Sequence, residues 1–158
     1  MPKPLDARDQ NFLYIIDEHG WHVMHVTADD EAPGFTYSTG IFRLTGRPEL
    51  IVFGLPGDVA HFVLNEYGNR ANAGEALAPG DFCEGFLDGH QVTFLSVEDE
   101  GQIRRHATWT DWFYDRQPFP LLQLVYPDSK SGAFPWQPGY REAWRWDQPL
   151  LGVPPARS

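Results

Sequence analysis

Three features are scarce in this sequence: cysteine, positive charge and long hydrophobic runs. Cys83 is the only cysteine among 158 residues, which excludes an intramolecular disulfide and a zinc site built on several thiolates. Twelve Lys and Arg residues oppose 22 Asp and Glu residues, and the net charge of −10 disfavours binding to nucleic acid or to anionic membranes. A single cysteine fits a reducing cytoplasm, which is the expected location. No stretch approaches the roughly 18 apolar residues of a membrane span, so none is expected.

The composition is that of a folded chain, with 42% hydrophobic and 15% aromatic residues. No linker or internal repeat divides the sequence, so residues 1–158 are interpreted as a single domain. The charge is uneven, because residues 1–100 hold 17 acids and 5 bases, whereas residues 101–158 hold 5 acids and 7 bases. Five of the six Trp residues also fall in this second part, which is therefore the aromatic and slightly basic end of an acidic chain.

Hydrophobic spacing and turn residues predict an α+β fold. Helices are expected over residues 6–18, begun by Asp6 with Asp9, and over 58–67, ended by Gly68, with a further helical stretch over 102–114. Strands are predicted over residues 21–27, 35–41, 49–55, 82–87, 91–97 and 121–126. Turns at 45–48 and 88–90 predict hairpins. The expected architecture is a mainly antiparallel sheet, with a barrel-like or split-barrel-like form as one option, and two to three packed helices.

Polar side chains embedded in apolar strands are the candidates for a ligand site. Tyr37, Ser38 and Thr39 place hydroxyls on consecutive strand positions, where one pair could line a pocket. Gln123 lies within a Leu/Val run, so a buried amide there must bond either to protein backbone or to a ligand. Asp128 ends that run, and Tyr114 and Trp136 could form the aromatic wall of a cleft. The alternative is structural: Thr and Tyr are good strand residues, and Gln123 is satisfied within the protein.

His19, His22 and His25 recur every third residue, a spacing that would gather them on one side of a helix. On the predicted strand His22 and His25 point to opposite faces, so no metal site is expected. His22 and His61 are the candidates for a general acid or base, with a hydrogen-bonded structural role as the alternative. Phosphate-loop, dinucleotide, zincin and serine-hydrolase motifs are missing, so the sequence assigns neither a cofactor nor a reaction.

Several motifs, in order along the chain, resemble the bacterial family catalogued as domain of unknown function 4262. They are Gly20-Trp21-His22-Val23, Phe35-Thr36-Tyr37-Ser38-Thr39-Gly40, Arg47-Pro48-Glu49-Leu50-Ile51-Val52-Phe53-Gly54-Leu55, Trp112-Phe113-Tyr114, Leu122-Gln123-Leu124-Val125-Tyr126-Pro127-Asp128, Phe134-Pro135-Trp136 and Gln148-Pro149-Leu150-Leu151. The similarity extends over residues 9–151 and implies a bacterial origin and a single compact domain, but no established activity. Arg47 and Tyr126 depart from the family pattern, in which His and Trp often stand.

Residues 35–55 are also loosely similar to the flavin-binding split barrels. In those proteins hydroxyls, backbone amides and Arg hold the flavin phosphate, and aromatic side chains stack on the ring. This resemblance implies phosphate contacts by Ser38, Thr39, Arg43 and Arg47, and ring contacts by Trp112, Tyr114 or Trp136.

Two functional hypotheses follow. The first is a small-ligand or nucleotide-like binding domain with an aromatic-lined pocket, drawn from Tyr37, Ser38, Thr39, Arg43, Arg47, Tyr114, Gln123, Asp128 and Trp136. The alternative is an acidic interaction module, such as an immunity or antitoxin-like protein, whose runs at 29–31 and 98–100 meet a basic protein partner. Solvated acidic loops that keep the protein soluble are the other interpretation of those runs.

Overall fold

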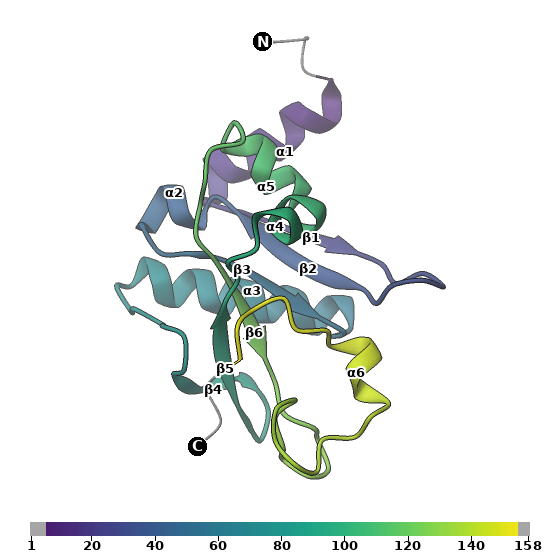
Figure 1. Ribbon diagram of the computed structural model, residues 1–158. Coiled ribbons are helices and arrows are strands. Elements are labelled where there is room, and N and C mark those ends of the chain that lie inside the picture. The colour runs from purple at the N-terminus through teal and green to yellow at the C-terminus, as the bar shows by residue number, and fades with distance from the viewer. Residues whose placement is uncertain (1–5, 155–158) are drawn as a thin grey trace.

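The computed structural model describes residues 6–154, and its strands form one open, mixed sheet (Figure 1). The strands are β1 (His22–Val26), β2 (Phe35–Thr39), β3 (Glu49–Phe53), β4 (Phe82–Leu87), β5 (His90–Ser96) and β6 (Leu121–Val125), in the spatial order β1-β2-β3-β6-β5-β4. Neighbours are antiparallel except β3 and β6, which are parallel. The α+β class and the largely antiparallel pairing are confirmed. The barrel-like form is wrong, because β1 and β4 are separate edges of the sheet.

The parallel pair occupies the centre of the sheet. Every residue of β3 and of β6 is buried, which explains why both segments are almost continuously apolar and lack the alternation of half-exposed strands. Side chains of β3 alternate between two cores, since Leu50 and Val52 belong to one hydrophobic cluster and Ile51 and Phe53 to the other. The sheet is therefore covered on both faces.

Helices form the two covering layers. They are α1 (Ala7–His19), α2 (Ile41–Thr45), α3 (Gly57–Asn72), α4 (Glu100–His106), α5 (Thr108–Phe113) and α6 (Trp144–Asp147). The long helix α3 crosses one face against β1–β4, while α5 packs on β2 from the opposite face and lies beside α1 (Figure 1). The described residues thus contain six helices rather than two or three, and the additional ones are short.

Local signals account for most element boundaries. Asp6 and Asp9 form the reciprocal capping box that begins α1, and Gly20 ends the helix. The hairpin of β4 and β5 turns at Asp88 and Gly89, as predicted. The connection from β2 to β3 differs from the expected tight turn, because it contains α2. The stretch expected to be helical over 102–114 is divided into α4 and α5 at Ala107.

The end of α3 is a second difference. Gly68 does not stop this helix, which continues to Asn72. A Cβ atom at Gly68 would lie 2.5 Å from Cζ2 of Trp21, so the glycine gives space for an indole ring packed on the helix. Its role is close packing between α3 and the residue that precedes β1, and that role has no local sequence signal.

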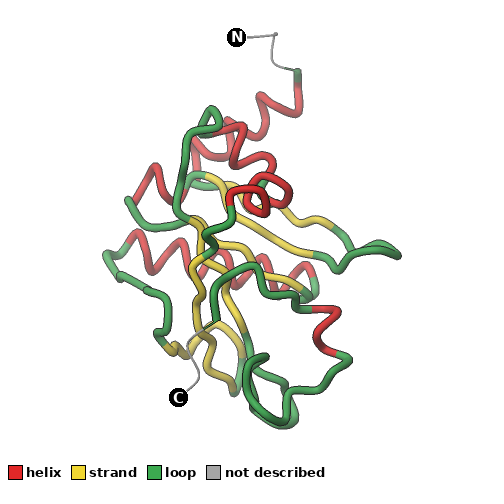
Figure 2. The backbone as a smooth tube through the Cα atoms, in the orientation of Figure 1, coloured by secondary structure: helices red, strands yellow, loops and turns green. Residues whose placement is uncertain are grey.

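The chain beyond β6 is mostly loop and returns to the sheet near its end (Figure 2). Gln148 anchors it by exchanging side-chain hydrogen bonds with the backbone N–H and C=O of Tyr126. The single turn α6 interrupts this segment, and Trp144 packs against the core on the α3 side. Polar clamps, rather than regular structure, hold this Trp-rich part of the chain.

Candidate functional site

The strand hydroxyls singled out in the sequence lie in a closed network around Glu49. Ser38 Oγ donates to Glu49 over 2.6 Å and accepts from the backbone N–H of Leu50 over 3.0 Å. Thr39 bonds to Thr110, whose hydroxyl also donates to the Ser38 carbonyl. Ser38, Thr39 and Thr110 have no exposed surface, so their polar atoms are used within the protein.

Glu49 is the buried carboxylate at the centre of this network, which sequence reasoning missed. It accepts from the backbone N–H groups of residues 40–42 over 2.8–3.2 Å, where α2 begins, and from the Tyr114 hydroxyl. Burial raises the pKa of Glu49, and the surrounding donors oppose that rise. We call Glu49, Ser38, Tyr114 and the N–H groups of residues 40–42 the Glu49 cluster. The sequence feature that could have indicated this cluster is an acidic residue at the start of an apolar strand.

Gln123 serves the C-terminal segment. Its Nε2 donates to the Pro149 carbonyl over 2.7 Å, and its Oε1 accepts from the N–H groups of Leu151 and Gly152. All of these partners are backbone atoms, and the side chain is fully buried. The structural alternative raised for this residue therefore accounts for its amide, and Gln123 fixes the returning chain against β6.

The Asp128 carboxylate also has its hydrogen-bond partners within the protein. Both of its carboxylate oxygens bond to the Arg141 guanidinium over 2.7 Å, and the backbone N–H groups of Lys130, Ser131 and Arg141 also donate to them. The Arg141 guanidinium holds the pKa of Asp128 well below its usual range. The pair closes the loop between β6 and α6.

The remaining ligand candidates lie apart from one another. Arg43 places its guanidinium over the Phe113 ring, and Arg47 donates to the Gly74 carbonyl. Tyr37 is 1% exposed, and its hydroxyl accepts from the Trp109 N–H. Trp136 stacks on Phe134 and lines an apolar cavity of about 320 Å³ with Phe82, Leu95 and Val153 among others. The structure does not gather these residues into one pocket.

The two acid/base candidates, in contrast, line the same cavity. His22 of β1 and His61 of α3 border a space of about 440 Å³ at the β1 edge of the sheet. The other residues of its lining are Ile15, His19, Trp21, Val23, Asn65 and Asn69. We call this space the histidine cavity. The α3 residues recur at intervals of four, so one face of the helix presents an imidazole and two amides to it.

His22 is the most constrained of the three imidazoles. Its ring packs on Phe12 of α1 with centroids 4.7 Å apart. Its Nδ1 atom is buried and has no hydrogen-bond partner among residues 6–154. Burial, and secondarily the neighbouring His61, lower the pKa of His22 from its ordinary value of 6.5. The protein therefore holds at the cavity an imidazole that resists protonation and whose Nδ1 atom has no partner in the described part of the chain.

Trp21 forms a fixed wall of the cavity. Its indole N–H donates to Asn65 Oδ1 over 2.9 Å, and its ring packs against the face of α3 that Gly68 leaves open. An indole N–H is a donor only, so this bond determines which way the Asn65 amide is turned. The wall is thus positioned by packing and by one hydrogen bond, without a ligand.

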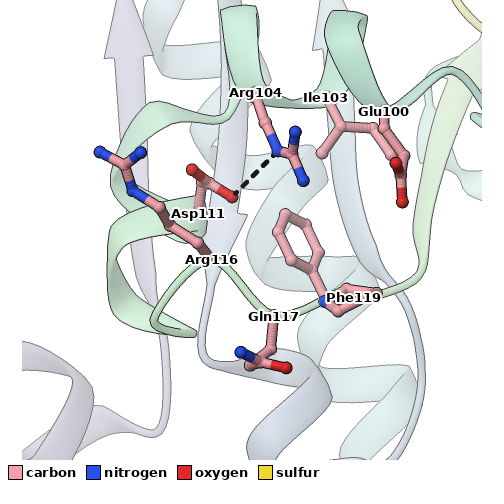
Figure 3. A pocket seen from close by; sticks show the side chains of 8 residues that line it. Glu100, Ile103, Arg104, Asp111, Arg116, Gln117 and Phe119 are labelled. Carbon is pink, nitrogen blue, oxygen red and sulfur yellow. Dashed lines mark ion pairs between the residues drawn. The ribbon is translucent and has the colours of Figure 1, made fainter.

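Figure 3 shows a smaller cavity formed by α4, α5 and the segment before β6. Arg104 extends toward Asp111, with Nε and Oδ1 4.0 Å apart, and Phe119 lies beside them. Its volume of about 40 Å³ has room for only a few water molecules. Asp115 and Arg116 nearby have left-handed φ angles of 55° and 60°. This cavity is too small to hold an organic ligand.

The acidic runs have partly local roles. Asp29 accepts from the N–H groups of Glu31 and Ala32 in a turn, and Asp99 caps α4 by accepting from the Gln102 N–H. These bonds explain one acid in each run. Binding of a basic protein by the remaining acids stays a prediction.

Metal and membrane sites receive no support within residues 6–154. No group of three or more His, Cys, Asp or Glu side chains there is arranged to hold a metal ion, and His22 and His25 line different cavities. None of the described helices has the length and apolar character needed to span a bilayer.

The fold and the cavity define an α+β protein with an imidazole- and amide-lined space at one edge of an open mixed sheet. Residues 15–141 match the family described as domain of unknown function (DUF4262), and the chain belongs to that family. The resemblance found in the motifs is thereby confirmed. Comparison with curated proteins and with solved structures finds no significantly similar chain.

Proposed function

We propose that this protein binds a small polar molecule in the histidine cavity. The observation that carries the proposal is the buried Nδ1 atom of His22, which has no partner among the described residues and belongs to a side chain that lines the cavity. Buried polar atoms in folded proteins are nearly always paired, and an exception calls for a bound partner or a functional role. Nδ1 itself has almost no accessible surface, so a molecule bound beside the His22 ring would supply that partner through a small shift of the lining side chains.

The lining favours binding over covalent catalysis. It contains no hydroxyl, thiol or carboxylate side chain, so the cavity offers no nucleophile of the usual kinds. The imidazoles of His19, His22 and His61 are the groups there that could move a proton. Gln123 and the ligand candidates in the Glu49 cluster stabilise the fold and do not line this cavity. The aromatic side chain of the site is Trp21.

The test uses the indole N–H of Trp21 as a reporter in ¹H–¹⁵N NMR spectra, assigned with the Trp21→Phe variant. A set of neutral, cationic and anionic fragments is added to the full chain. We expect at least one class to shift the Trp21 signal in the wild-type protein. The shift should vanish in Asn69→Trp, whose ring would fill the cavity, and persist in Asn72→Trp, on the same helix but outside the lining.

Two results would overturn the proposal. One is a Trp21 signal that no fragment moves at concentrations up to the solubility limit. The other is a shift of equal size in Asn69→Trp and in the wild-type protein, since such binding would lie elsewhere.

A further inference from the structure

The histidine cavity presents hydrogen-bond donors whose orientation is fixed. Asn65 Oδ1 is occupied by the Trp21 indole N–H, so the Nδ2 group is the part of this amide left for a ligand. Nδ2 makes no hydrogen bond to another residue in the described part of the chain, and it carries two donors. The ligand atom that Asn65 can recognise is therefore an acceptor.

The titratable side chains that line the cavity are all imidazoles. His19 faces it from α1 and His61 from α3, and Arg8 lies over the Trp109 ring, which packs on Phe12 behind His22. No carboxylate is among the lining residues. A second imidazolium close to the first is unfavourable without a counter-charge, and an anion in the cavity would supply that charge. Low water content at a partly buried site would strengthen the attraction.

We propose that the histidine cavity is a site for a small anion, whose carboxylate or phosphoryl oxygens accept from Asn65 Nδ2, from protonated His22 and from a ring N–H of His61. This inference rests on the proposed function and specifies its ligand class. Binding takes up a proton, because the anion stabilises an imidazolium that the empty cavity disfavours. By linkage, the affinity then falls as the pH rises through the imidazole range.

The experiment compares three probes that distinguish charge and source: acetate, its neutral isostere acetamide, and inorganic phosphate. Each is titrated into the full chain while the Trp21 indole signal and the Cε1–H signals of His22 and His61 are followed. Acetate is the cleaner pH probe, because its charge is constant between about pH 6 and pH 8 while imidazole titrates. We expect its affinity to fall by roughly tenfold per pH unit above the imidazole pKa, as uptake of one proton requires.

The diagnostic variant is Asn65→Asp. It keeps an oxygen for the Trp21 indole N–H and replaces the NH₂ donors with a negatively charged oxygen. We expect acetate and phosphate affinity to fall by at least about tenfold, the equivalent of about 1.4 kcal/mol. Asn72→Asp is the matched control, since it makes the same charge change on α3 outside the cavity. His61→Gln provides a second variant at an exposed position and should lower the anion affinity, because it removes a ring N–H donor.

The outcomes separate this inference from the proposed function. Acetate or phosphate binding that is lost in Asn65→Asp and retained in Asn72→Asp supports the anion site, and the stronger probe identifies the headgroup. Acetamide binding without acetate or phosphate binding would overturn the anion site and leave the ligand cavity intact. Equal anion affinity in Asn65→Asp and wild type would also overturn it. Failure of every fragment to move Trp21 would remove both.

Discussion

The Glu49 cluster and the histidine cavity are two polar regions built on neighbouring strands. They differ in whether other protein groups form hydrogen bonds with their polar atoms. In the Glu49 cluster, the carboxylate accepts from two side chains and from the backbone at the start of α2, and it has no exposed surface. In the histidine cavity, His22 Nδ1 and Asn65 Nδ2 have no protein partner among residues 6–154. The first region is closed by the protein, and the second keeps polar atoms for which we propose a ligand as the partner.

This difference shows why a polar residue in an apolar strand does not by itself indicate a site. Ser38, Gln123 and His22 carry the same sequence signal, and only His22 is left with an unpartnered buried atom. What separates them is the presence of a complementary group from a distant part of the chain: Glu49 for Ser38 and residues 149–152 for Gln123. Substitutions in each region test whether its polar atoms depend on partners within the protein.

The largest effect is expected from Glu49→Leu. The change leaves the N–H groups of residues 40–42 and the hydroxyls of Ser38 and Tyr114 without their shared acceptor. Removing one partner of a buried charged network costs about 3–5 kcal/mol of unfolding free energy. Urea unfolding measures the loss, with Glu98→Leu, an exposed acid of the same charge, as the control. A loss below about 1 kcal/mol would mean that the cluster is not closed as described.

The next effect is expected from Gln123→Leu, which keeps the side-chain volume roughly similar and removes the amide. The N–H groups of Leu151 and Gly152 then lose their acceptor, at about 1–3 kcal/mol for buried donors. Hydrogen exchange should quicken at these two amides more than at the central strand residues Leu50 and Leu124. Unchanged protection at residues 151 and 152 would contradict the assigned clamp.

A smaller effect is expected from Tyr114→Phe. The phenol donates to Glu49 and accepts from the Arg43 N–H, so its loss weakens the cluster without removing the carboxylate. We expect a destabilisation of about 1–2 kcal/mol in urea unfolding, less than for Glu49→Leu. Trp112→Phe, at a partly exposed neighbour on α5, is the control. A larger loss of unfolding free energy for Tyr114→Phe than for Glu49→Leu would contradict the central role assigned to the Glu49 carboxylate.

Much of the fold could be predicted from local patterns. The Asp6 cap and Gly20 bound α1, and alternating or continuously apolar segments between turn residues located every strand in the described part of the chain. The predictions that were wrong or missing concerned features that depend on residues far away in the sequence. Gly68 resembles a helix stop, and only the Trp21 ring from another element explains why α3 continues. The parallel pairing of β3 with β6 could not be derived either, because long connections carry no register signal and both strands read simply as buried.

The site could be predicted only in part. His22 and His61 were singled out by their titration range, but their shared cavity depends on how β1 lies against α3. Asn65 and Asn69 were missed, although His61, Asn65 and Asn69 recur every fourth residue on a predicted helix, a signal that could have been found. Glu49 was missed because it was taken as the first residue of an apolar strand.

The smallest effect concerns the pH dependence of stability and tests the open region directly. Burial and His61 lower the pKa of His22 in the folded protein below the value of 6.5 expected when the chain is unfolded. Below 6.5 the unfolded chain therefore binds a proton that the folded protein does not, and stability decreases as the pH falls through this window. The decrease should continue down to the lowered folded pKa.

His22→Leu removes that group, so its unfolding free energy should decrease less on acidification than the wild-type value. Urea unfolding at about pH 7.5 and about pH 5.5 measures the difference between the two slopes, on either side of the ordinary imidazole pKa. His90→Leu is a comparison at the first residue of β5, which is not among the residues that line the cavity. If the two variants show the same slope, His22 is not desolvated and the cavity is as satisfied as the Glu49 cluster. Acetate should raise the unfolding free energy of the wild-type protein at the lower pH and leave that of His22→Leu unchanged. That result would show that the histidine cavity differs from the Glu49 cluster because an anion from solution is its partner.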